Sequence, residues 1–76
     1  MLNTYKASMY TGPTQVRTWA NKARLFFADC PVLEGTERVW ILDIKAASIY
    51  DVERDMRVLF PRTSGFSTGL FVARVD

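Results

Sequence analysis

The chain has 76 residues, of which 49% are hydrophobic, and ten basic residues against eight acidic ones give a net charge of +2. This share of apolar sequence excludes an intrinsically disordered chain. The small net charge argues against an acidic mimic of nucleic acid and against a protein that holds nucleic acid by charge alone. The length predicts one small α/β domain over residues 1–76.

Cysteine and membrane signals are sparse. The chain has one cysteine, Cys30, which cannot form an intrachain disulfide, so an oxidising compartment is not implied. Neither end carries the pattern of a signal peptide or of a membrane-spanning helix. We therefore expect a cytoplasmic protein with no membrane association.

The first half of the chain predicts a strand, a helix and a loop. Residues 2–10 alternate loosely between apolar and polar side chains, which is typical of a half-buried strand. Residues 14–29 repeat apolar side chains at helical spacing, and Pro31 ends that helix at the latest. Residues 30–36 predict a loop.

The second half of the chain repeats this order. Residues 37–45 are apolar and β-branched nearly throughout and predict a central strand. Ser48 is a good N-cap for a second helix that ends before Pro61. A turn-rich loop over 62–69 and a last strand over 70–75 follow. The β-α-β-α-β order predicts an α+β two-layer sandwich, in which a three-stranded sheet carries two helices on one face.

Candidates for catalysis are few. Without histidine the chain lacks the usual general base and cannot form a Ser-His-Asp or Cys-His arrangement. A structural zinc site would need about four Cys or His ligands, and no glycine-rich phosphate-binding motif is present. For Asp43, inside the most apolar strand, we expect an ion pair with Arg74 or Lys6, or an exposed edge. We expect no enzyme, no catalytic residues, no metal site and no cofactor.

The sheet face away from the helices is the first candidate binding surface. If Trp40, Leu42 and Ile44 face the helices, alternation places their neighbours on the other side. Apolar patches of this kind usually mark a protein partner or a dimer; loop 30–36 folding over the patch is the alternative. The candidate protein-binding residues of this face are Val39, Ile41, Leu70 and Val72, with Tyr10 at the border of the patch. Two further candidates lie elsewhere: Tyr50 on the flank of the second helix and Phe66 in the loop 62–69.

One flank of the two helices is the second candidate surface. Arginine interleaved with tyrosine and asparagine suits contact with phosphates and stacking of bases. It suits a protein interface equally well, and a plain solvated face is the third interpretation. The candidate nucleic-acid-binding residues on this flank and in the following loop are Arg17, Asn21, Arg24, Arg54, Arg57 and Arg62.

The sequence therefore predicts a non-catalytic protein-binding module that acts as a small inhibitor or regulator of a larger host complex. Its partner is expected to be a host protein or a nucleoprotein complex, and a homodimer stays open. Small self-contained chains of this kind are common among phage and mobile-element proteins, including those with an anti-defence role. The alternative is a small nucleic-acid-binding protein that uses the arginine-rich helix flank.

Overall fold

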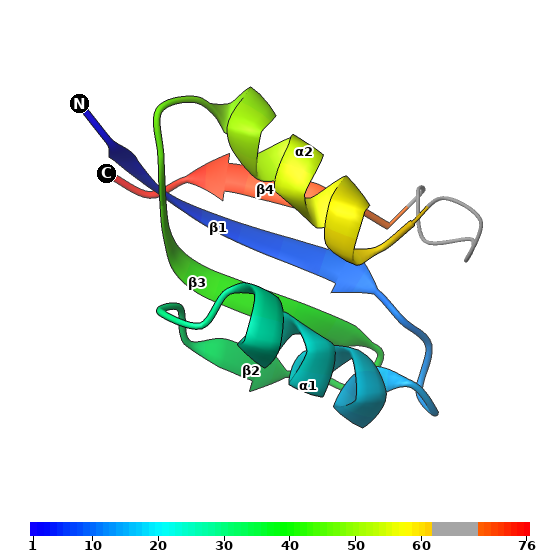
Figure 1. Ribbon diagram of the computed structural model, residues 1–76. Coiled ribbons are helices and arrows are strands. Elements are labelled where there is room, and N and C mark those ends of the chain that lie inside the picture. Colours follow the sequence, from blue (N-terminus) through cyan, green and yellow to red (C-terminus); the bar gives the residue numbers. More distant parts are fainter. Residues whose placement is uncertain (62–68) are drawn as a thin grey trace.

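A computed structural model describes residues 1–61 and 69–76, which form two layers, a sheet and a pair of helices (Figure 1). The elements in chain order are β1 (Asn3–Tyr10), α1 (Val16–Phe26), β2 (Val32–Glu34), β3 (Arg38–Ala46), α2 (Ile49–Leu59) and β4 (Phe71–Arg74). The strands form one sheet in the order β2-β3-β1-β4, with antiparallel neighbours throughout. This β-α-β-β-α-β order is that of the ferredoxin-like, or split β-α-β, motif.

The α+β class with two helices is confirmed, but the expected three-stranded sheet is wrong by one strand. β2 lies within residues 30–36, which the sequence predicts as a loop, and pairs with β3 through Val32↔Ile41 and Glu34↔Val39. Three residues are too few to show the alternation that identifies a strand in sequence. No helix within the described ranges is long and apolar enough to cross a bilayer.

The two helices cover the same face of the sheet (Figure 1). α1 packs against β2 and β3, and α2 packs against β4, β1 and β3. The predicted N-cap of α2 is confirmed, since the hydroxyl of Ser48 accepts a hydrogen bond from the backbone N–H of Asp51 at 3.4 Å. This bond satisfies one of the free N–H groups at the start of the helix.

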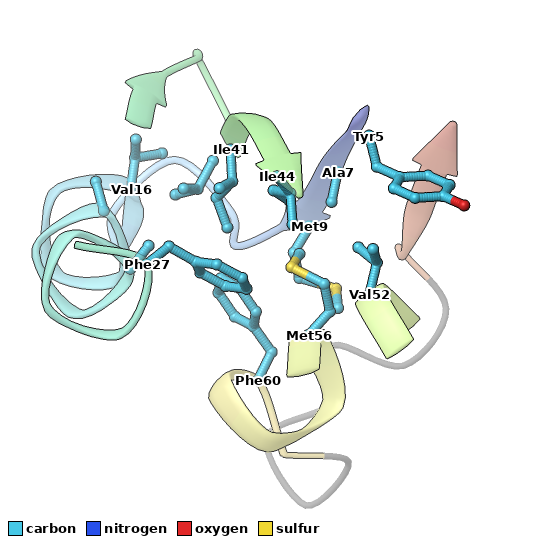
Figure 2. Packing of buried hydrophobic residues seen from close by; sticks show 13 residues of the cluster. Tyr5, Ala7, Met9, Val16, Phe27, Ile41, Ile44, Val52, Met56 and Phe60 are labelled. Atoms are coloured by element: carbon cyan, nitrogen blue, oxygen red, sulfur yellow. The ribbon is translucent and has the colours of Figure 1, made fainter. Parts of the chain in front are cut away.

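The C-cap residue of each helix is a phenylalanine whose side chain is buried in the core. The backbone N–H of Phe27 bonds the carbonyl of Ala23, and that of Phe60 bonds the carbonyl of Met56. Both rings point into the space between the helices and the sheet (Figure 2), and Phe60 is 1% exposed. The Trp19 ring lies 5.0 Å from that of Phe60 and joins the two helices. Burial of one such ring stabilises a fold by roughly 1.5–3 kcal/mol.

A β-bulge interrupts the alternation of β3. Val39, Ile41 and Ile44 all belong to the core, so the inward side chains change from odd to even positions along the strand. The pairing with β1 shifts at this point, and Asp43 has a φ of 56°. One extra residue in one strand produces this change, and aspartate is among the few side chains that tolerate a positive φ.

The two ends of the described chain meet at one end of the sheet (Figure 1). The N–H of Val75 donates to the carbonyl of Thr4 at 2.9 Å, and the N–H of Thr4 donates to the Asp76 carboxylate at 3.0 Å. The second bond, and to a lesser degree Arg74, holds the pKa of the Asp76 carboxyl below its usual range.

Candidate functional site

The four apolar residues predicted to face away from the helices lie on the helix side instead, and that prediction is wrong. For Val39 and Ile41 the reason is the bulge in β3, whereas Val72 lies on the helix side because it pairs with the buried Ala7 of β1. Ile44 does face the helices, but counting back from it in steps of two assigns the wrong face to every residue before Asp43. Val39 and Ile41 are fully buried, and Leu70 and Val72 are partly buried and pack against the edge of the core.

The face of the sheet away from α1 and α2, which we call the open face, instead carries a row of side chains from all four strands. The register aligns Leu33 of β2 with Trp40 of β3, Trp40 with Ser8 of β1, and Ser8 with Phe71 of β4. Leu33 is 53% exposed and Phe71 44% exposed. Trp40 thus lies on the side opposite to the one that strand alternation predicts for it.

The two rings of this row pack together over the middle strand. The ring centroids of Trp40 and Phe71 are 5.9 Å apart, with their planes inclined at 66°, which is a favourable edge-to-face arrangement. Ser8 lies between them in the register and is completely buried, although α1 and α2 both lie on the other face. Trp40 is only partly exposed and is not part of the helix-covered core. The rings therefore form a small apolar platform directly on the sheet.

Three cations accompany the platform on the open face. Arg38 donates from Nη1 to the hydroxyl of Ser8 at 3.0 Å and to the carbonyl of Gly69 at 2.9 Å, so its guanidinium is fixed beside the platform. Lys45 donates from Nζ to the hydroxyl of Thr4. Lys6 lies between them, because its neighbours Tyr5 and Ala7 both point into the core.

Gly69 has a steric reason to lack a side chain. A Cβ at this position would lie 2.5 Å from the Cβ of Tyr10, closer than real atoms approach. Glycine therefore allows the chain to pass against Tyr10 and to present its carbonyl to Arg38. Tyr10 itself is 44% exposed and pairs with Arg38 in the register, so it stands on the open face as predicted for a binding residue.

The carboxylates of the strands lie on the other side. Within the described strands only Glu34 and Asp43 are acidic, and both are on the helix side. Glu34 accepts from Arg17 at 2.9 Å and from Arg24 at 3.2 Å. The first bond is the main reason that the pKa of Glu34 is lowered. Among the described residues, none of the three open-face cations Lys6, Arg38 and Lys45 has an ion-pair partner.

The arginines of the predicted helix flank are mostly paired. Besides the bridges from Arg17 and Arg24 to Glu34, Asn21 accepts a hydrogen bond from Arg24 at 2.9 Å. Arg54 bonds Asp51 at 3.1 Å and Asp55 at 3.6 Å. Arg57 and Tyr50 are both exposed on this flank, and Arg57 forms no salt bridge with a described residue. The predicted site residues Arg62 and Phe66 lie outside the described residues.

A pocket of about 440 Å³ lies between the end of α1 and the bulge of β3. Its lining includes Asp29, Cys30, Asp43 and Asp55 beside the ring of Phe26. Asp43 is exposed there and makes neither of its two expected ion pairs: Arg74 instead bonds Asp76 at 3.1 Å, and Lys6 is on the opposite face. Burial, and then the nearby Asp29 and Asp43, raise the pKa of the Cys30 thiol. A thiol in this setting is a poor nucleophile.

Over residues 1–61 and 69–76, no group of three or more histidine, cysteine or acidic side chains is placed to hold a metal ion. Comparison with protein-family models, with curated proteins and with solved structures finds no match for this chain. The open face is therefore the candidate site that the geometry itself singles out, since it combines exposed apolar rings with unpaired cations.

Proposed function

We propose that this chain is a non-catalytic binding module that holds a macromolecular partner on its open face and so regulates or inhibits a larger complex. The observation that carries this proposal is the row of Leu33, Trp40 and Phe71 on the side of the sheet away from α1 and α2. The solvated face of an antiparallel sheet normally carries polar side chains. A contiguous apolar row there is typical of a surface that a partner covers.

The residue types of the open face support a binding role. Tryptophan, tyrosine and arginine dominate the energetic centres of interfaces, and the open face carries Trp40, Tyr10 and Arg38 close together in the register. The side chains of Trp40 and Arg38 are held in place before binding, because Trp40 packs on Phe71 and Arg38 donates hydrogen bonds to Ser8 and Gly69. A fixed side chain loses less conformational entropy when a partner binds.

The non-catalytic part of the proposal is supported by the pocket. Its thiol, Cys30, has a raised pKa and stays protonated near neutral pH, and the chain has no histidine to activate it. The nearby Asp29, Asp43 and Asp55 line an open depression, in which no described residue pairs a nucleophile with a base.

Photo-crosslinking tests which side of the molecule meets the partner. Two variants each carry the photo-reactive amino acid p-benzoylphenylalanine at one position. In one it replaces Leu33, which is 53% exposed on the open face, and in the other it replaces Leu25, which is 84% exposed on α1. The two sites match in residue type, and the more exposed one lies on the helix side. In cells that produce the chain, we expect adducts of higher mass from position 33 and few from position 25. Adducts from position 25 alone, or from both equally, would contradict the proposal.

A further inference from the structure

We propose that the open face binds single-stranded nucleic acid, with bases stacked on the platform of Trp40 and Phe71 and phosphates beside Lys6, Arg38 and Lys45. This inference rests on the proposed function, because it names the partner of the same face. It replaces the arginine-rich helix flank as the surface for nucleic acid. It is carried by the charge, the ring chemistry and the layout of the face.

The charge of the open face points to an anionic partner. On the helix side Arg17 and Arg24 share the carboxylate of Glu34, and Arg54 is paired with its acidic neighbours Asp51 and Asp55. On the open face Lys6, Arg38 and Lys45 have no carboxylate within reach among the described residues. The chain has a net charge of only +2, but three of the five described cations without an ion pair lie on this face, the other two being Lys22 on α1 and Arg57 on α2. Charge of one sign on one side attracts a ligand of the opposite sign.

The rings of the open face point to a partner with planar groups. Phe71 and Tyr10 are each 44% exposed, and Trp40 lies beside Phe71. Bases of a single strand stack on such rings without regard to sequence, whereas bases inside a duplex already stack on one another. The hydroxyl of Thr4, next to Lys45, adds a group that can bond a phosphate or sugar oxygen.

The layout of the face suits a linear polyanion. Arg38 lies on one side of the platform along the strands, and Lys6 and then Lys45 follow on the other. A strand that crosses the platform would thus meet a cation before and after the rings. A second copy of the chain fits less well, since two open faces would bring like charges together. An acidic protein with aromatic side chains would match both the cations and the rings, so the test includes poly-glutamate beside the single strands.

The test measures binding of fluorescein-labelled 15-nucleotide oligo(dT) and oligo(U) by fluorescence anisotropy at low salt. The intact chain is expected to bind one or both single strands, and the pair of probes distinguishes DNA from RNA. Each phosphate contact with a single strand contributes about −0.7 to the slope of the logarithm of the binding constant against the logarithm of salt concentration. Three contacts therefore predict a slope near −2. A 15-base-pair duplex should bind more weakly than either strand.

Variants locate the site. Trp40→Ala should weaken binding about ten-fold or more, because it removes a stacking surface. Trp40→Phe, which keeps a ring, should lose less. Lys6→Ala and Lys45→Ala should each reduce the salt slope by about 0.7. Arg57→Ala is the matched control, since it removes one exposed cation from α2 and should leave binding unchanged. Circular dichroism confirms that each variant is folded.

Each other outcome overturns the inference. It fails if neither strand binds at low salt, if the duplex binds equally well, or if Arg57→Ala weakens binding while Lys6→Ala does not. It also fails if poly-glutamate binds more tightly than both strands, since an acidic protein is then the partner. If the oligonucleotides fail while position 33 still crosslinks, the proposed function stands without this partner. If both fail, the open face has no binding role.

Discussion

Asp43 is a single residue that decides which side chains of β3 reach the open face. Its φ of 56° accommodates the extra residue of the bulge, so Val39 and Ile41 share the core side with Ile44. Strand alternation assumes an unbroken period of two and has no means of detecting an inserted residue. The aspartate within an apolar strand is the one signal of the bulge in the sequence, although a charge at such a position equally predicts an ion pair.

Asp43→Gly is expected to raise the free energy of unfolding by up to about 1 kcal/mol. Glycine adopts a positive φ without the clash that other L-residues suffer, and this gain exceeds the extra entropy it gives the unfolded chain. Asp43→Ala, which keeps the clash and loses the polar side chain, should be destabilising. Urea denaturation measures both variants. Equal effects of glycine and alanine would show that the backbone conformation at position 43 is not strained.

Among the elements, the helices could be predicted well and the shortest strand could not. The spacing of Val16, Ala20 and Ala23 in α1 carries the amphipathic signal over eleven residues, and Ser48 marks where α2 begins. β2 has only three residues, and its place in the sheet depends on pairing with β3. β2 is the short arm of a hairpin with β3, and its three residues are too few for the alternation that identifies a strand. The candidate site was misplaced because the bulge changes the faces of β3 and because the row depends on the register of β1, β3 and β4, which are distant in sequence.

β2 is also joined to α1 by ion pairs, which predicts a dependence of stability on pH. The pKa of Glu34 is lowered in the folded chain, chiefly by its hydrogen bond with Arg17 and further by Arg24. A carboxyl with a lowered folded pKa contributes stability above its unfolded pKa, and that contribution disappears as the pH falls through the folded value. The free energy of unfolding should therefore decrease on acidification below the ordinary range of glutamate.

Glu34→Gln isolates this contribution. Its free energy of unfolding should vary less with pH over that acidic range than that of the intact chain, while Glu53→Gln, on the surface of α2, serves as the control. Thermal unfolding at a series of pH values measures the difference. The two bridges are exposed, so added salt should reduce the difference as well. Parallel pH profiles for Glu34→Gln and the intact chain would show that the bridges do not stabilise the fold.

At the scale of the whole molecule, the separation of charge predicts that the chain is a monomer in solution. Apolar rings on an open face favour association, but Lys6, Arg38 and Lys45 surround them on both copies. Replacing Lys6 and Lys45 together by glutamate should relieve this repulsion through cross-pairing with Arg38 and shift the chain toward a dimer. Sedimentation velocity measures the change. A dimer of the intact chain at low salt would contradict this account of the face.

The meeting of the two chain ends has a consequence for protein engineering. Thr4 bonds both Val75 and Asp76 across neighbouring strands, so a short linker could join the ends without disturbing β1 or β4. New ends opened at Gly35, in the turn between β2 and β3, would give a circularly permuted chain with the same sheet order. By the same geometry, the domain could be placed inside an exposed loop of another protein with the open face still accessible.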